Sequence, residues 1–207
     1  TYPNFELVIW DDGSTDESWE IINGYTDARI RAARNETGKS GWGIRKGIAH
    51  IGNSAYVAIH HSDDVWEPQK LEKQVRFLDE NPRIGAVFSR AHIIGENSEP
   101  FTDKKHFYYS IFDQPNRSRH EWLNYFFNRG NALCHPSVLI RKRCYEECGY
   151  YRSGFTQIGD MEMWVRLCFK YEIHILPEKL LRYRVRSNDA NLSGNRPVTR
   201  IRSQFEY

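Results

Sequence analysis

The 207-residue chain has few cysteines and no pattern that would put them to use. Its four cysteines form no Cys-x-x-Cys pair, and no histidine stands near them at the spacing of a zinc site. Cys144 and Cys148 are one helical turn apart, where side chains pack more readily than they form a disulfide. We therefore expect reduced core thiols and a reducing compartment, which fits a cytoplasmic protein.

Long apolar runs and an excess of one charge are also missing. No segment approaches the ~20 apolar residues of a membrane-spanning helix, and no charged-then-apolar signal segment opens the chain. The 29 basic and 27 acidic residues are interleaved and leave a net charge of +2, which gives a nucleic-acid surface little support. We expect a soluble module without a nucleic-acid partner. We allow for peripheral association with the inner face of the membrane through segments outside this sequence.

Short apolar runs alternate with helical patterns in the first half of the chain. Residues 5–10, 56–59 and 84–89 have the composition of strands buried on both faces, and a helix is predicted between residues 68 and 81. Weaker signals predict helices at 120–128 and 160–171 and strands at 137–140, 173–176 and 181–185. The alternation predicts an α/β fold of the Rossmann-like kind, an open, mostly parallel sheet flanked by helices.

The first predicted strand ends in Asp11 and Asp12, on a strand-to-helix turn where backbone N–H groups and the helix dipole favour negative charge. Asp11 alone is best interpreted as a turn cap, whereas for Asp12 we favour a contact to a base or ribose. A calcium loop is excluded because Glu17 and Asn23 replace its glycine and its final glutamate. The spacing from Ser14 to Glu17 predicts a capping box and a helix start there.

A second acidic turn, His61-Ser62-Asp63-Asp64, follows the strand predicted at 56–59. Paired carboxylates at a strand end suit Mg²⁺ or Mn²⁺ and leave coordination positions for phosphates. For Asp64 a helix N-cap is nearly as good an interpretation, whereas for Asp63 the metal is favoured because two acidic turns at one sheet edge are hard to explain as caps. Asp160 stands at a predicted helix start and, taken alone, is an N-cap.

Together these blocks resemble the large inverting glycosyltransferase family numbered two, which has the GT-A fold. The matching blocks are TYPNFELVIWDDGSTD at residues 1–16, SDDVWEP at 62–68 and GDMEMW at 159–164. Three blocks in this order make a specific match, and the resemblance covers nearly the whole chain. It implies one catalytic domain over residues 1–207, with a nucleotide-binding half at 1–90 and an acceptor-side half at 91–207.

The resemblance also implies roles for individual residues. Asp12 would read the nucleotide base, and Asp63 would bridge a Mn²⁺ or Mg²⁺ ion and the diphosphate with support from Asp64. Asp160 would be the catalytic base that deprotonates an acceptor hydroxyl as it attacks the anomeric carbon with inversion. The implied activity is that of a hexosyltransferase in polysaccharide or glycoconjugate assembly. Its donor would be a nucleotide-diphosphate sugar, UDP being usual, and its acceptor a carbohydrate or a lipid-linked molecule.

The sequence departs from the family pattern at several places. His61 stands where the family commonly has aspartate, and Gly159 stands where it commonly has glutamate. Arg186 replaces a late histidine and could pair with the diphosphate directly. Arg45 follows a loosely matching glycine-rich stretch and is a candidate phosphate or base contact. The family's first strand and helix are absent from this sequence, so we expect an N-terminally truncated GT-A domain.

Other functions remain open at this point. A nucleotidyltransferase would use similar nucleotide and metal apparatus, but the chain has no early basic glycine-rich loop. A glycoside hydrolase needs two carboxylates at a fixed separation, which a sequence does not reveal. A non-catalytic module that binds nucleotides or carbohydrates, as an inactive relative or fragment, fits the absence of the family's first strand.

Overall fold

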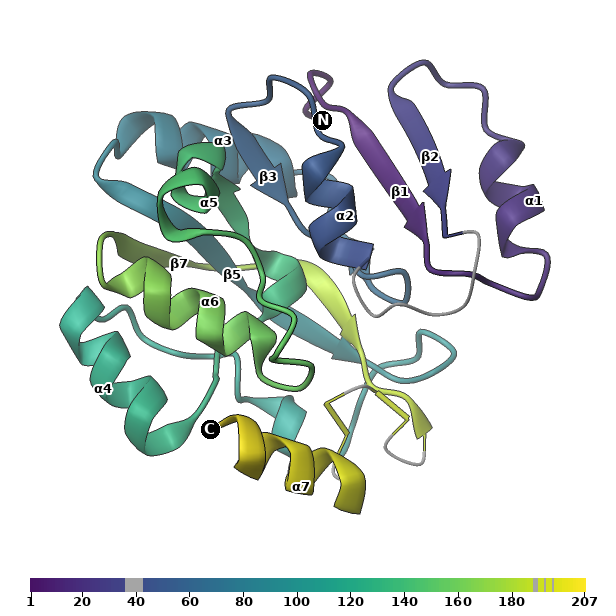
Figure 1. The fold of residues 1–207 in the computed structure, drawn as a ribbon. Coiled ribbons are helices and arrows are strands. Elements are labelled where there is room, and N and C mark those ends of the chain that lie inside the picture. The colour runs from purple at the N-terminus through teal and green to yellow at the C-terminus, as the bar shows by residue number, and fades with distance from the viewer. Residues whose placement is uncertain (36–42, 188–189, 192, 195) are drawn as a thin grey trace. The chain divides into compact units, whose positions relative to one another are not determined.

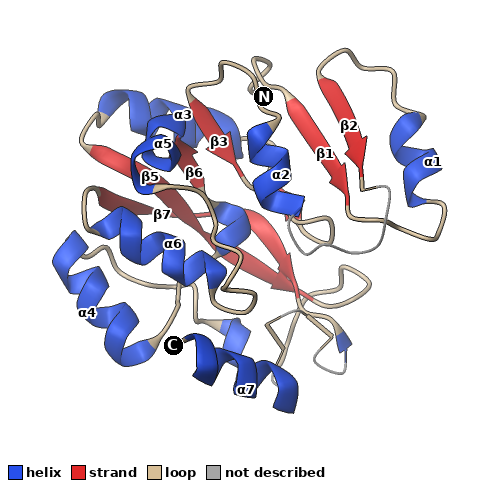
Figure 2. Cartoon of the chain, viewed as in Figure 1, coloured by secondary structure: helices blue, strands red, loops and turns tan. Residues whose placement is uncertain are grey.

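The computed structural model describes residues 1–35, 43–187, 190–191, 193–194 and 196–207. The chain divides into a smaller unit, residues 2–55, and a larger unit, residues 56–207 together with Thr1. The border falls inside residues 1–90, which the sequence analysis assigns to one half. Helices and strands of both units are labelled in Figure 1 and coloured by type in Figure 2.

The smaller unit contains a two-stranded parallel sheet and two helices. Strand β1 (Leu7–Asp11) pairs with β2 (Ile30–Arg34), so that their last residues lie opposite each other. The helices are α1 (Ser18–Asn23) and α2 (Gly43–Ala49). Leu7 exposes 37% of its surface, so β1 is only partly covered, in contrast to the expected strand buried on both faces.

The predicted capping box at Ser14 is wrong. Helix α1 begins four residues later, at Ser18, and its N-cap residue Glu17 makes no side-chain capping bond. The reason is that Ser14 is already occupied: its N–H and its hydroxyl both donate to the Asp11 carboxylate. Asp11 therefore folds the turn back on itself before the helix can start.

The larger unit is built on a five-stranded sheet of order β3-β6-β5-β7-β4. The strands are β3 (Tyr56–Ala58), β4 (Val65–Trp66), β5 (Ile84–Ile94), β6 (Leu139–Arg141) and β7 (Glu172–Arg184). Only β5 and β7 pair in parallel in this described sheet, and the other three pairs are antiparallel. The expected mostly parallel arrangement is corrected here, because apolar composition predicts a buried strand without fixing its direction.

The long β5 and β7 pair carries the core of the larger unit. The two strands predicted at 173–176 and 181–185 are one strand, β7, which follows β5 past a register shift near Arg90. Five helices and two short 3₁₀ turns flank the sheet in the described residues. They are α3 (Lys70–Glu80), η1 (Phe107–Tyr109), α4 (Arg119–Arg129), η2 (His135–Ser137), α5 (Lys142–Cys148), α6 (Gly159–Cys168) and α7 (Pro197–Glu206).

Large apolar side chains fill the space between the helices and the sheet. Trp122, Phe88 and Trp164 are fully buried, which accounts for part of the high aromatic content. All four cysteines are free thiols, as predicted. Among the described residues, none of the helices has the length and apolar composition that crossing a membrane requires.

Candidate functional site

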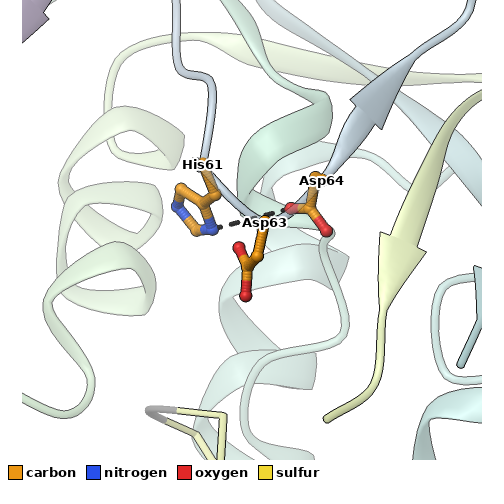
Figure 3. A group of neighbouring side chains, drawn as sticks. All are labelled: His61, Asp63 and Asp64. Carbon is orange, nitrogen blue, oxygen red and sulfur yellow. Dashed lines mark ion pairs between the residues drawn. The ribbon is translucent and has the colours of Figure 1, made fainter. Parts of the chain in front are cut away.

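The second acidic turn brings three potential metal ligands together in the larger unit. After β3 the chain turns at His61–Asp64, where the Asp64 N–H donates to the His61 carbonyl at 3.3 Å. One side-chain ligand atom from each of His61, Asp63 and Asp64 lies within 4.8 Å of the others (Figure 3). Asp64 is not the N-cap of α3, whose N-cap residue is Gln69.

Asp64 is buried and only half satisfied. Its Oδ1 accepts the Arg184 N–H at 2.8 Å, which fixes the orientation of the carboxylate. Its Oδ2 is buried and accepts no hydrogen bond from the described residues. Burial raises the pKa of Asp64 to about 7, and the nearby Asp63 charge adds to the rise. The hydrogen bond from the Arg184 N–H acts in the opposite direction and lowers this pKa. An ionised Asp64 therefore lacks a full counter-charge.

His61 does not provide that counter-charge. Its Nδ1 lies 3.8 Å from Asp64 Oδ2, but burial and the neighbouring His135 lower the pKa of His61 to about 3. The imidazole is therefore neutral at pH 7 and presents a lone pair. Two carboxylates, one of which has a buried oxygen without a hydrogen-bond donor, and one neutral imidazole are a donor set that fits a divalent cation. These residues would hold the ion that the family resemblance implies.

A second histidine, His135, packs against the His61 ring. The His135 ring, on η2, meets the His61 ring edge-on with 5.0 Å between centroids. His135 Nε2 is hydrogen-bonded to the Tyr151 hydroxyl at 2.8 Å, and burial lowers the pKa of His135 to about 4. The pair fixes the position of the His61 ring without adding charge.

Asp160 is the second residue of α6 and not its N-cap, which is Ile158. Its Oδ1 accepts the Met161 N–H at 2.8 Å, and its Oδ2 accepts from Asn131 Nδ2 at 2.7 Å. Burial raises the pKa of Asp160 to about 6, and these hydrogen bonds oppose the rise. A carboxylate with this pKa is mostly ionised at pH 7 and still basic enough to accept a proton.

Both acidic groups of the larger unit lie near one buried thiol. Burial raises the pKa of Cys134 well above its ordinary value, and the charges of Asp64 and Asp160 raise it further. Glu162 takes no part, since it pairs with Arg166 at 2.7 Å on another face of α6, as its spacing predicts. The acidic turn and Asp160 therefore flank the same segment, which contains Cys134.

In the first acidic turn, in the smaller unit, both aspartates have charged or amide side chains as partners within the protein. Asp11 is buried and pairs with Arg34 at 2.9 Å. The half-buried Asp12 carboxylate accepts a hydrogen bond from Asn35 Nδ2. The Oδ1 atom of Asn35 in turn accepts a hydrogen bond from Lys46 Nζ. Arg45 is exposed on α2, and residues 36–42 of the glycine-rich stretch before it lie outside the described residues.

At the end of β7 the acidic turn is held by Arg184 rather than by the predicted Arg186. Arg184 Nε donates to the Asp63 carbonyl at 2.7 Å, whereas Arg186 is exposed and its N–H donates to Asn191 Oδ1 at 2.8 Å. Sequence reasoning missed Arg184 and Asn131, because both act across long separations in the chain. His61 had a signal, since it stands two residues before Asp63 in the same turn.

Several known proteins are similar to this chain in sequence. An uncharacterized glycosyltransferase of Methanocaldococcus jannaschii is 26% identical over 204 residues, which cover 97% of this chain and 65% of that relative. The UDP-Glc:alpha-D-GlcNAc-diphosphoundecaprenol beta-1,3-glucosyltransferase WfaP of Escherichia coli is 39% identical over 79 residues, which cover 38% of this chain and 32% of that protein. The chain thus spans less than two thirds of the length of either relative.

The fold has a counterpart among solved structures. The crystal structure of S. aureus TarS 1-349 superimposes with a TM-score of 0.66 at 18% identity, and the match covers 88% of this chain and 52% of that one. This likeness supports the predicted GT-A-like α/β fold. The family described as Glycosyl transferase family 2 matches residues 1–144, more than half of the sequence, and the chain therefore belongs to that family.

Proposed function

We propose that this chain transfers a hexose from a nucleotide-diphosphate sugar, UDP-linked by preference, to an acceptor hydroxyl with inversion. The observation that carries the proposal is the acidic turn, where His61, Asp63 and the half-satisfied Asp64 form a donor set for a divalent cation. Family membership supports the reaction class, and the name of the E. coli relative WfaP supports the UDP-linked donor.

Asp160 is proposed as the general base. Its carboxylate takes the proton of the acceptor hydroxyl as that oxygen bonds to the anomeric carbon. The bond between this carbon and the diphosphate oxygen breaks on the opposite side, and its electron pair leaves with the nucleoside diphosphate. Asn131 and the Met161 N–H hold the carboxylate in place for this step. A bound Mn²⁺ or Mg²⁺ ion supplies neutralisation of the diphosphate charge.

The remaining proposed contacts are to the donor. Asp12 accepts from the base, as its place at a strand end and its half-buried carboxylate favour. Arg45 and Arg186 are proposed phosphate contacts, and both are exposed basic residues. The proposed acceptor is a carbohydrate or a lipid-linked sugar in polysaccharide assembly, by analogy with the diphosphoundecaprenol-linked acceptor in the name of WfaP. A lipid-linked acceptor would bring the protein to the cytoplasmic face of a membrane.

The direct test is a panel of nucleotide sugars with Mn²⁺ and lipid-linked or oligosaccharide acceptors, in which release of nucleoside diphosphate is measured and the product's anomeric configuration is read by NMR. We expect acceptor-dependent release with inversion. Asp160→Asn should lower kcat by about 10²- to 10⁴-fold, because the general base is lost. Its donor affinity, measured by calorimetry, should stay within about 2-fold of wild type because Asp160 serves the acceptor.

Other outcomes would replace the proposal. Donor binding without turnover on any acceptor would favour a non-catalytic binding module. Formation of a nucleotide sugar from a sugar phosphate and a nucleoside triphosphate would favour a nucleotidyltransferase. Wild-type turnover by the Asp160→Asn variant would show that Asp160 is not the general base.

A further inference from the structure

We propose that His61, through Nδ1, is a third protein ligand of the divalent cation, and that this nitrogen makes the site select Mn²⁺ and Co²⁺ over Mg²⁺. The inference rests on the proposed function, since it adds a ligand to the proposed cation site and fixes which ions that site prefers. Asp63 and Asp64 supply the oxygen ligands. His61 supplies the one soft donor of the group.

The distances in the acidic turn suit a shared ion. Two ligand atoms that each lie about 2.1 Å from one cation are about 3.0 Å apart at a right angle and about 4.2 Å apart on opposite sides. His61 Nδ1 and Asp64 Oδ2 are 3.8 Å apart, which is inside this range and too far for a hydrogen bond between them. Figure 3 shows Asp63 beside this pair, and the three ligand atoms lie within 4.8 Å of one another.

The environment of Asp64 gives an independent reason to place a cation between Asp64 Oδ2 and His61 Nδ1. The Asp64 side chain is 2% exposed, and Oδ2 has no hydrogen-bond donor among the described residues. Because Arg184 holds Oδ1, the carboxylate cannot rotate away, and Oδ2 stays on the side of His61. A buried carboxylate oxygen without a partner is costly, and a cation between Oδ2 and Nδ1 removes that cost.

Aromatic packing holds the His61 ring. His135 packs edge-on against the ring, and Tyr151 holds His135 through a 2.8 Å hydrogen bond. Such outer groups fix ring orientation and contribute to metal affinity. Neighbouring His60 faces elsewhere, since its ring packs on Trp66 with 4.6 Å between centroids. Of two adjacent histidines, only His61 belongs to the acidic cluster, so His60 is a matched control.

The nitrogen changes which ion binds best. Mg²⁺ prefers oxygen ligands, whereas imidazole favours later first-row ions, whose affinities rise from Mn²⁺ to Co²⁺. A site of one imidazole and two carboxylates therefore discriminates against Mg²⁺ more strongly than an all-carboxylate site. Replacement of His61 by aspartate, the residue that is common at this place in the family, should restore Mg²⁺ binding.

The test uses the metal alone, without nucleotide or turnover. Binding of Mn²⁺ to the 207-residue protein is titrated by the EPR signal of the free ion, Mg²⁺ and Co²⁺ are measured by competition, and bound Mn²⁺ is examined by electron spin echo modulation for coordinated ¹⁴N. We expect imidazole ¹⁴N modulation in the wild type and in His60→Ala, and none in His61→Ala or His61→Asp. His61→Ala should weaken Mn²⁺ binding by about 10-fold or more. His61→Asp should lower the ratio of Co²⁺ to Mg²⁺ affinity by about 10-fold.

The outcomes separate this inference from the proposed function. Tight Mn²⁺ binding without ¹⁴N modulation would overturn the role of His61 and leave the Asp63 and Asp64 site intact. Wild-type affinity that equals that of Asp63→Ala would remove the cation site from the proposed function and His61 with it. The wild-type spectrum decides the question even if a His61 variant fails to fold.

Discussion

Two pairs of adjacent aspartates follow strands in this chain, and each pair contains one deeply buried carboxylate. Asp11 and Asp64 are similarly hidden, with side chains 2% exposed in both cases. Asp11 Oδ1 accepts two hydrogen bonds from Ser14, and Arg34 Nε lies 2.9 Å from Oδ2 as an ion-pair partner, although this oxygen, like Asp64 Oδ2, accepts no hydrogen bond from the described residues. Asp64 Oδ1 accepts one backbone N–H, and the ion-pair partner of Oδ2 among the described residues is the neutral His61, 3.8 Å away, in place of an arginine.

The difference shows how a structural carboxylate can be told from a ligand-binding one. A buried charge needs a partner, and where the protein supplies it the residue serves the fold. Where the protein leaves a buried carboxylate without a cationic partner, we infer that a bound cation is that partner. By this criterion Asp11 holds the turn before Asp12, whereas we assign Asp64 to the proposed cation site.

The comparison predicts opposite effects of the same substitution, and this is the largest expected change in stability. Asp11→Asn should destabilise the metal-free protein by about 2 to 3 kcal/mol, because the Arg34 pair and the bonds from Ser14 are weakened. Asp64→Asn should stabilise it by about 1 to 2 kcal/mol at pH 8, because an uncompensated buried charge disappears. Urea denaturation of the two variants in EDTA measures both. Equal destabilisation would show that Asp64 is as well satisfied as Asp11.

The stabilising effect of Asp64→Asn should depend on pH. The pKa of Asp64 is about 7 in the folded state and 3.8 in an ordinary environment, so the folded state binds this proton more tightly. The contribution of Asp64 to the free energy of unfolding of the wild type therefore falls as pH rises from about 4 to about 7. The advantage of Asp64→Asn should be small at pH 4.5 and full at pH 8, and Mn²⁺ should abolish it at pH 8. A pH-independent difference would contradict the role of charge.

Asp160 is intermediate, since among the described residues it has two hydrogen-bond donors and no ion-pair partner. If it is the base, kcat/KM should rise with pH through an apparent pKa near 6, because only the ionised form accepts a proton. Removal of the Asn131 donor in Asn131→Ala should move this limb upward by about 0.5 to 1 pH unit, because the bond stabilises the ionised form. Cys134 and Tyr151 are two titratable groups that the Asp160 charge influences among the described residues, and because burial raises the pKa of both, both remain neutral in this range. An unshifted profile would assign Asn131 to folding alone.

The smallest effect is expected around Asp12. Asn35 links Asp12 to Lys46, so Asn35→Ala should weaken UDP binding by about 5-fold through loss of one positioning bond. Arg45→Ala, one residue from Lys46, tests the exposed side of α2 in the same calorimetric titration. A larger loss for Arg45→Ala than for Asn35→Ala would shift the donor contact from Asp12 to Arg45.

The sequence was sufficient to locate the acidic turns, because a strand that ends in paired aspartates leaves a strong local signal. It predicted β3, α3, α4 and the free thiols for the same reason, since each depends on local pattern or composition. It did not predict the antiparallel strands, the single long β7, or the start of α1. The strand directions and the length of β7 depend on which strands pair in the folded protein. The start of α1 depends on Ser14, which bonds to the preceding Asp11 and not to the following Glu17.

The partners of the site were beyond sequence reasoning for a physical reason. Arg184 reaches Asp63 across 121 residues, and Asn131 reaches Asp160 across 29. Only the packed fold brings such groups together. His61 was visible as a departure from the family pattern, but its nearness to both carboxylates became evident only in three dimensions.

The central claim is that the turn at Asp63 and Asp64 binds a nucleoside diphosphate through a divalent cation, and calorimetric titration with UDP tests it most directly. The wild type should bind UDP at least about 10-fold more tightly in Mn²⁺ than in EDTA, because the ion neutralises the diphosphate. Asp63→Ala should lose this difference, whereas Asp12→Ala should weaken binding under both conditions and keep it. Equal UDP affinity of the wild type with and without Mn²⁺ would contradict the account.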